Sequence, residues 1–341
     1  MAAPSGSIAD VTTEHSTRPR TVAVIVNPAA RGAVGAGAIA AAARPFQARG
    51  WEFLIQEADG ADSTRALTAA FAAQGVGVVL VCGGDGALRQ ALSGLRGAGA
   101  VETVIGLIPA GTGNVWAREA RIPRDLEEAL GLLEHGARRR VDLGLLRIGF
   151  DGEPTRFVLA CGVGLDAAIV DAVERRPSVK RALGRLAFAL PGIVAGVAWR
   201  PAAADLEVDA ASRHHARMLA TIIANTSRYG GVAPVAGRAR VDDGLLDIVT
   251  FEDDEGSSAS HRLGLALEAT RGDLDARAVV GVTYERGTRV VLTPERALPV
   301  QADGDVIAMC GPDTPLIVEV EPAAVTMLVG PGPNPLWGVP G

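Results

Sequence analysis

Residues 76–89 read VGVVLVCGGDGALR and indicate the class of fold. The apolar run 76–82 predicts a buried strand, and residues 87–95 predict an amphipathic helix. In the turn between them, Gly83-Gly84-Asp85-Gly86, the missing Cβ atoms let the backbone approach a ligand closely. Unpaired amides at the start of a helix favour an anion, so we predict a phosphate-binding turn. By itself the motif fits an ordinary strand-to-helix turn equally well, and Asp85 needs a cation or a hydroxyl group to offset its charge.

A second glycine turn follows a neighbouring apolar segment. Residues 22–26, 51–55 and 104–108 have the uninterrupted or strand-like apolar character of a parallel sheet covered on both faces. After 104–108 the chain continues as Pro109-Ala110-Gly111-Thr112-Gly113-Asn114 and then enters a predicted helix. Open α/β sheets bind ligands beyond the carboxyl ends of their strands. We therefore predict that the two turns share one phosphate site.

Length and pattern predict two domains. A chain of 341 residues that is 48% hydrophobic and 21% charged is long enough for two cores. Strand and helix alternate to about residue 136, whereas short strand-like segments dominate afterwards. We expect a flexible tail (1–19), an α/β nucleotide-binding domain with a parallel sheet (20–144), a mostly antiparallel β-sandwich domain (145–330) and a loose end (331–341). A hinge at 141–149 would leave a cleft between the domains.

Charge and cysteine content disfavour some functions. The net charge is −6 and no long basic run is present, so nucleic acid is not an expected partner. Three separated cysteines in apolar contexts indicate reduced core residues of a cytoplasmic protein. No apolar run reaches the roughly 20 residues of a spanning helix. The longest, 186–199, fits either core packing or transient contact with a membrane surface, which would make the protein peripheral.

Two acidic motifs in the second half are candidates for chemistry. The loop 240–247, RVDDGLLD, offers carboxylates and carbonyls, which are the hard oxygen ligands that Mg²⁺ prefers. Asp303-Gly304-Asp305 presents carboxylates between two strands, where one could take a proton from a substrate hydroxyl. Each motif by itself is better explained as an ordinary turn, because Asp-Gly is the commonest turn chemistry.

Taken together, the motifs resemble the diacylglycerol kinase catalytic-domain family, which includes bacterial lipid kinases and sphingosine kinases. The resemblance covers about residues 20–330, and the joint set is far more specific than any one motif. The matching positions, in order, are Asn27-Pro28, Gly83 to Gly86, 106–114, 162–167, Lys180-Arg181 with Gly184, Asn225 with Gly230-Gly231, 242–247 and Asp303-Gly304.

This resemblance implies an ATP- and Mg²⁺-dependent kinase that phosphorylates a lipid hydroxyl. It implies Asp305 as the proton acceptor. It implies magnesium bound by Asp243 and by the backbone carbonyls of Arg240 and Leu245. The implied nucleotide-binding residues are Asn27, Gly83, Gly84, Asp85, Gly86, Gly111, Thr112, Gly113 and Asn114. A homodimer is a further expectation. The sequence does not identify the lipid acceptor.

Three positions depart from the family pattern. Ala87 stands where Thr is usual, Val115-Trp116 where Asp-Phe is common, and Asp305 where Glu is usual. A misplacement of about 1 Å can cost on the order of 100-fold in rate. The alternative to an active kinase is therefore a weak or inactive nucleotide- or lipid-binding regulator of the same fold. NAD kinase-like and phosphofructokinase-like enzymes rank lower, because they share less than the whole set of motifs.

Overall fold

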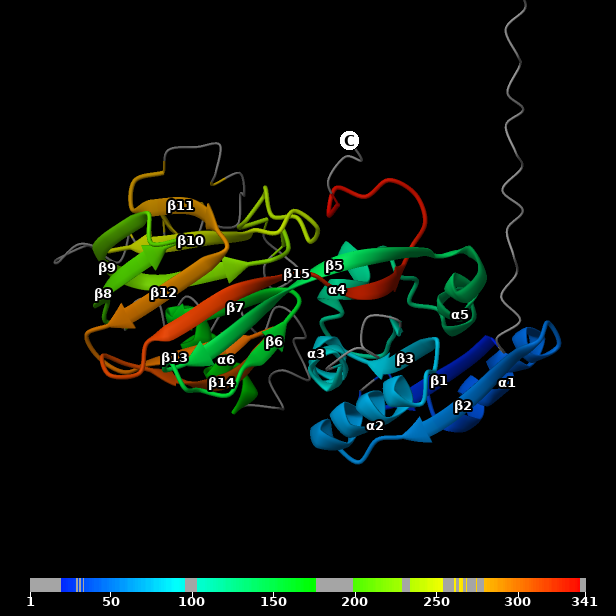
Figure 1. Ribbon diagram of the computed structural model, residues 1–341. Helices are drawn as coiled ribbons and strands as arrows, with labels where there is room; N and C mark the ends of the chain where they lie inside the picture. Colours follow the sequence, from blue (N-terminus) through cyan, green and yellow to red (C-terminus); the bar gives the residue numbers. More distant parts are fainter. Residues whose placement is uncertain are drawn as a thin grey trace, which may run out of the picture.

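The computed structural model describes residues 20–28, 30, 32, 34–95, 103–175, 199–228, 234–253, 261, 264–265, 268, 274 and 279–337. Two lobes share one continuous mixed sheet (Figure 1). The predicted tail 1–19 and most of the apolar run 186–199 lie outside the described residues. Lys180, Arg181, Gly184, Gly230 and Gly231 lie outside them too. None of the helices in the described ranges combines the length and apolar character needed to span a bilayer.

The first lobe is the predicted α/β domain with a parallel sheet. Its strands are neighbours in the order β2-β1-β3-β4, and all three pairs are parallel. β3 and β4 are buried along their whole length, as their apolar sequences predict. The elements are β1 (Arg20–Val26), α1 (Ala36–Gln47), β2 (Trp51–Glu57), α2 (Ala61–Ala73), β3 (Val78–Gly83), α3 (Asp85–Gly94), β4 (Val104–Pro109), α4 (Val115–Glu119) and α5 (Leu126–His135).

The second lobe is the predicted antiparallel β-sandwich. Leu146, Ile223, Val300 and Val318 are part of its buried apolar core. The strands are β5 (Ala137–Ile148), β6 (Thr155–Phe157), β7 (Ala160–Gly164), β8 (Ala202–Val208), β9 (Ser212–Ala224), β10 (Leu246–Glu252), β11 (Val282–Gly287), β12 (Arg289–Pro294), β13 (Leu298–Ala302), β14 (Asp305–Cys310) and β15 (Leu316–Val329). One helix, α6 (Leu165–Glu174), follows β7 directly.

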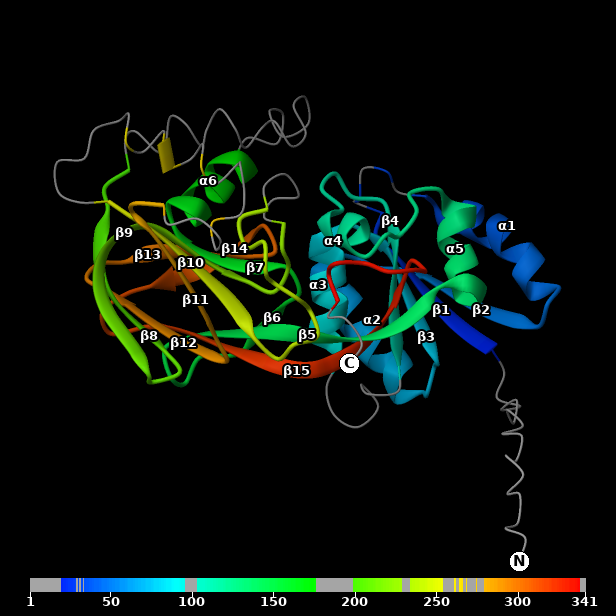
Figure 2. The same ribbon diagram turned by 90° about the horizontal axis from the view of Figure 1, so that it is seen from above.

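Two long strands connect the lobes. β5 and β15 pair antiparallel from Leu316 opposite Ile148 to Val329 opposite Ala137, with a register shift between Glu321 and Val325. In Figure 2 these strands run from one lobe into the other. β15 pairs with β4 in the first lobe and with β12 in the second. The expected hinge at 141–149 and the expected boundary at 144 therefore fall mostly within an unbroken strand, because β5 pairs with β15 on both sides of that boundary.

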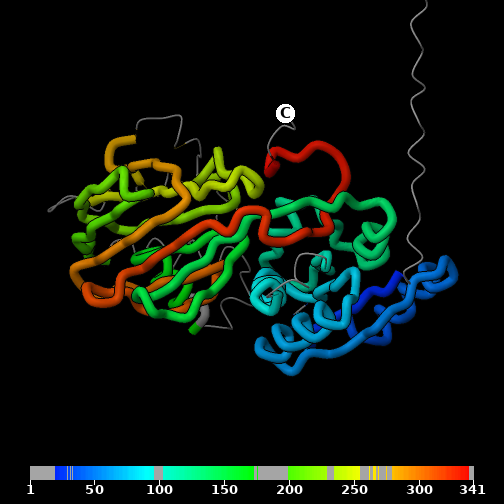
Figure 3. Tube along the Cα trace, in the orientation of Figure 1, coloured from blue at the N-terminus to red at the C-terminus, as the bar shows by residue number. Residues whose placement is uncertain are grey.

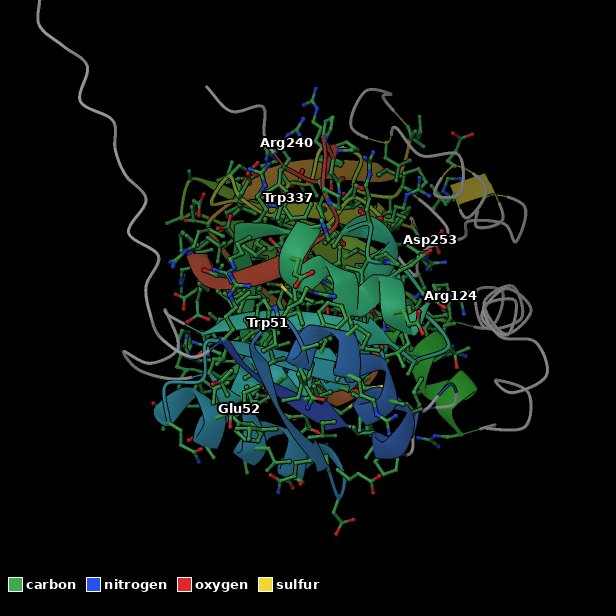
Figure 4. All side chains as sticks on the ribbon, turned by 90° about the vertical axis from the view of Figure 1, so that its right-hand side faces the viewer. Trp51, Glu52, Arg124, Arg240, Asp253 and Trp337 are labelled. Carbon is green, nitrogen blue, oxygen red and sulfur yellow. The ribbon has the colours of Figure 1, made fainter. Side chains whose placement is uncertain are left out.

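The C-terminal segment returns to the first lobe (Figure 3). Leu336 and Trp337 are buried in its core, and the Trp116 and Trp337 rings meet edge to face at 6.4 Å. Arg240 Nη1 donates to the carbonyl oxygens of Pro335 and Trp337, at 2.9 and 2.8 Å. Figure 4 shows Arg240 and Trp337 at the same end of the molecule. The expectation of a loose end at 331–341 is therefore wrong for residues 334–337, because Leu336 and Trp337 supply apolar area despite the surrounding Pro and Gly.

Replacing Leu336 by Ala tests how much this segment stabilises the fold. Leu336 is 2% exposed, so its truncation leaves a cavity, and we expect the free energy of unfolding to fall by about 2–5 kcal/mol. Urea unfolding measures it, with Val280→Ala as the control, because Val280 is 85% exposed. Equal stability of the two variants would contradict the packing described for the C-terminal segment.

Candidate active site

The two glycine turns touch each other, backbone against backbone. A Cβ atom on Gly111 would lie 2.5 Å from Gly84 Cα, and one on Gly84 would lie 3.0 Å from Gly111 Cα. Real Cβ atoms do not approach other atoms as closely as 2.5 Å, so position 111 requires glycine, and at position 84 a side chain would have to push the facing backbone away. The structure thus brings together the turns after β3 and β4.

Asp85 joins the same two turns. Its carboxylate accepts hydrogen bonds from the backbone amides of Val115 and Trp116, at 2.9 and 3.0 Å. These amides begin α4, where the helix dipole favours a negative charge. Burial raises the pKa of Asp85, and these two hydrogen bonds oppose the rise. The sequence predicted a cation or a hydroxyl as the partner of Asp85; the structure places two amides there instead.

Asn114 closes the second turn from inside. It adopts φ +47°, a left-handed conformation that Asn tolerates better than most residues. Its Oδ1 accepts from the Gly111 amide at 2.9 Å, and its Nδ2 donates to the Gly111 carbonyl at 2.8 Å. Thr112 is exposed at the tip of the turn, with Gly113 beside it. The predicted residues 111–114 therefore form one compact turn with an exposed hydroxyl.

Asn27 borders the first turn. Its amide donates to the Cys82 carbonyl at 3.0 Å, which continues the β1–β3 ladder by one residue. A Cβ atom on Gly83 would lie 3.8 Å from Asn27 Cβ and 2.6 Å from Ala87 Cβ. Asn27 thus lies at the carboxyl end of the central strands, on the same edge as both glycine turns.

Asp305 reaches the first turn from the other lobe. It begins β14, directly after the turn formed by Asp303 and Gly304, both of which have positive φ. A Cβ atom on Gly86 would lie 3.1 Å from Asp305 Oδ2, and Arg89 Nη2 donates to this oxygen at 2.6 Å. The candidate proton acceptor is therefore adjacent to the candidate phosphate turn, although 219 positions separate Gly86 from Asp305 in the chain.

Asp303, unlike Asp305, holds the backbone of a neighbouring segment. Its carboxylate accepts from the amides of Val158, Leu159 and Ala160 at 2.8–3.2 Å. Burial raises its pKa to about 6, and these hydrogen bonds oppose the rise. Asp303 thus fixes the turn, whereas the Asp305 side chain remains 40% exposed. Of the two carboxylates in this motif, Asp305 is the one accessible to a substrate.

The acidic loop 240–247 lies at the junction of the lobes. Asp243 accepts from the Leu245 amide at 3.1 Å and pairs with Arg286. Asp142 in β5 accepts from the Gly244 amide at 2.7 Å, so this loop is tied to the connecting strand.

The donors of this loop suit a hard cation only in part. In the described ranges no three or more His, Cys, Asp or Glu side chains are arranged to hold a metal ion. A magnesium site here therefore needs backbone oxygens, such as the carbonyls of Arg240 and Leu245, beside the Asp243 carboxylate. Hard oxygen donors of this kind are what Mg²⁺ prefers, and retained waters complete its shell. The Arg286 guanidinium competes for the same carboxylate.

Sequence reasoning missed two residues of this region, Asp142 and Arg89. Asp142 is buried within 141–149, the segment expected to form a hinge. Arg89 lies four positions after Asp85, a spacing that indicates a pair within one helix. In the structure the Arg89 guanidinium instead pairs with Asp305 in the other lobe. Only the contact between the lobes reveals this partner.

Comparison with known families identifies the family of the chain. The diacylglycerol kinase catalytic domain model matches residues 21–146, and the YegS C-terminal NAD kinase beta sandwich-like domain model matches residues 160–329. The chain belongs to the diacylglycerol kinase catalytic-domain family. The resemblance seen in the sequence is thereby confirmed.

Relatives in this family match over most of their length. A diacylglycerol kinase of Mycobacterium tuberculosis (strain ATCC 25618 / H37Rv) is 28% identical over 309 residues, which is 90% of this chain and 94% of the relative. A diacylglycerol kinase of Bacillus subtilis (strain 168) is 24% identical and covers 83% of this chain and 88% of its own. A solved structure of a diacylglycerol kinase from Bacillus anthracis str. Sterne, 18% identical, superposes with a TM-score of 0.66 over 92% of this chain and 97% of that one, and is similar in fold.

Gly111→Ala tests the contact between the two turns of the diacylglycerol kinase fold. The added methyl group overlaps Gly84, so we expect the turns to separate, stability to fall by about 1–3 kcal/mol and ATP affinity to fall with it. Thermal unfolding and ATP titration measure both effects. Gly37→Ala is the control, since nothing lies within 4 Å of its added Cβ. Unchanged ATP binding in Gly111→Ala would contradict a nucleotide site at these turns.

Proposed function

We propose that this protein is an ATP- and Mg²⁺-dependent lipid kinase that transfers the γ-phosphate to a hydroxyl group of a lipid. The observation that carries the proposal is the position of Asp305, whose carboxylate from one lobe touches the Gly86 turn of the other. Phosphoryl transfer depends on aligning an acceptor with a bound phosphate and on stabilising charge. A carboxylate beside a phosphate turn meets the first of these requirements.

The residues of the first lobe would bind and orient the nucleotide. Amides of the Gly83–Gly86 turn and the Thr112 hydroxyl are donors for phosphate oxygens at the edge of the parallel sheet. Ala87 supplies no hydroxyl, so donors here come mainly from the backbone. Asp243 and the carbonyls of Arg240 and Leu245 would hold Mg²⁺, which neutralises phosphate charge when bound.

Asp305 would act as the general base. Its carboxylate accepts the proton of the lipid hydroxyl as that oxygen bonds to the γ-phosphorus, and the bond from that phosphorus to the bridging oxygen of ADP breaks. One proton moves to Asp305 and one phosphoryl group moves to the lipid, so no covalent enzyme intermediate is needed. The 40% exposure of the side chain leaves room for an acceptor to approach.

A lipid acceptor is supported by the family match and by relatives that are named diacylglycerol kinase. The cluster that includes Ala160, Ile222, Val249 and Phe251 is a second buried core of the sandwich lobe, separate from the main one. Transient contact with a membrane surface, which would deliver such a lipid, belongs to the same proposal.

The alternative is a regulator that binds nucleotide or lipid without chemistry. Two observations favour it, the missing hydroxyl at Ala87 and the shorter carboxylate at Asp305. A transfer assay separates the two functions directly, because only a kinase produces a phosphorylated lipid.

Transfer of labelled γ-phosphate from ATP to vesicles containing diacylglycerol, a sphingoid base or a polyprenol tests the proposal. We expect one class to be phosphorylated, EDTA to abolish the reaction, and Asp305→Ala to lower kcat by about 100-fold or more. Asp62→Ala, at a side chain 90% exposed on α2, is the control and should retain activity. ATP binding with no product from any lipid would favour the regulator instead.

A further inference from the structure

Arg89 is a buried cation with an unusual set of partners. Its side chain is 8% exposed, and Nη2 donates to Asp305 Oδ2 at 2.6 Å. Within the described residues its buried Nε has no hydrogen-bond partner. A buried, incompletely paired arginine is costly for the fold. Its hydrogen bond goes to the candidate catalytic carboxylate.

Arg156 shows what a structural arginine looks like in the same protein. Its Nε and Nη2 bind both carboxylate oxygens of Glu321, at 2.6 and 3.1 Å, and its Nη1 donates to the backbone carbonyls of Leu92 and Leu95 at the end of α3. All three guanidinium nitrogens of Arg156 donate hydrogen bonds, two of them to one carboxylate in the forked geometry that arginine favours. Arg89 donates its hydrogen bond to a single oxygen at the site, and its charge also opposes the rise in the pKa of the buried Asp303.

The geometry distinguishes the two oxygens of Asp305. Oδ2 is held by Arg89 and is also the atom that lies 3.1 Å from the Cβ position of Gly86. It therefore faces α3 and is packed against the glycine turn. Oδ1 is the oxygen left to meet a hydroxyl in the partly exposed region of the site.

The contacts with Gly86 and Arg89 depend on the length of the Asp305 side chain. At its present length the carboxylate lies next to Gly86 and within hydrogen-bond distance of Arg89. A glutamate at position 305 would have to displace either contact. The aspartate at this position, where the family pattern has glutamate, thus has a defined partner in Arg89.

We propose that Arg89 is a positioning residue, which holds Asp305 Oδ2 so that Oδ1 receives the proton of the acceptor hydroxyl. This inference rests on the proposed kinase function. The contact joins α3 of the nucleotide lobe to β14 of the sandwich lobe, so it also aligns the two halves of the site. Arg89 itself moves no proton.

Arg89→Met tests the assignment by removing the guanidinium while keeping an unbranched apolar stem. We expect kcat to fall by about 10- to 100-fold, since a displacement of about 1 Å has that effect, while KM for ATP changes little. Arg65→Met on the neighbouring helix α2 is the control, because Arg65 is 51% exposed. Thermal unfolding of each variant shows whether it is folded.

A compensating pair makes the test sharper. Lysine is one bond shorter than arginine and glutamate one bond longer than aspartate, so Arg89→Lys with Asp305→Glu keeps their combined length. We expect each single change to lower kcat and the double variant to recover part of the loss. A double variant whose loss equals the product of the two single losses would overturn the assignment of Arg89.

The outcomes also separate this inference from the proposed function. If the wild type phosphorylates a lipid and Arg89→Met has the kcat of Arg65→Met, the role of Arg89 is overturned and the kinase stands. If the wild type transfers no phosphate to any lipid, the kinase is overturned and the role of Arg89 falls with it.

Discussion

The paired strands β5 and β15 are the constraint on which the site depends, because they run through both lobes. The β5–β15 ladder is interrupted by a register shift between Glu321 and Val325. At this shift Asp142 accepts from the Ala323 amide at 2.5 Å and from Gly244 in the acidic loop. Burial raises the pKa of Asp142, while these bonds favour its charged form. A single buried carboxylate therefore joins the connecting strands to the candidate metal loop.

Rigid connection of this kind suits a site assembled from two lobes. Asn225 donates to the carbonyls of Asp142 and Val158, at 2.8 and 3.0 Å, and so fixes the sandwich side of the junction. The β13–β14 turn is held by Asp303 through the neighbouring amides 158–160. Asp305 thereby has a defined position relative to the glycine turns.

The sequence allowed much of this arrangement to be predicted, for identifiable reasons. Apolar runs ending in glycine turns predict a parallel sheet, and the structure confirms it at β3 and β4. The adjacency of Gly84 and Gly111 follows because the carboxyl ends of parallel neighbours share one edge. The family resemblance singled out Asp305; its specific role, and that of the magnesium loop, stay predictions.

What could not be predicted depends on contacts between distant segments. The partners of Asp85 are two amides 30 and 31 residues away, and the partner of Arg89 lies 216 residues away. Neither distance leaves a periodic signal in the sequence. The packing of Leu336 and Trp337 was missed because Pro and Gly around them indicate a loose end, whereas two large apolar side chains are enough to anchor it. Predictions from local composition do not capture single contacts of this kind.

The most direct measurement of the central claim is a crystal structure with Mg²⁺ and a non-hydrolysable ATP analogue. The account predicts phosphates against the amides of the Gly83–Gly86 turn and beside Thr112, with the terminal phosphate facing Asp305. Nucleotide bound elsewhere, or phosphates on the opposite edge of the sheet, would contradict it.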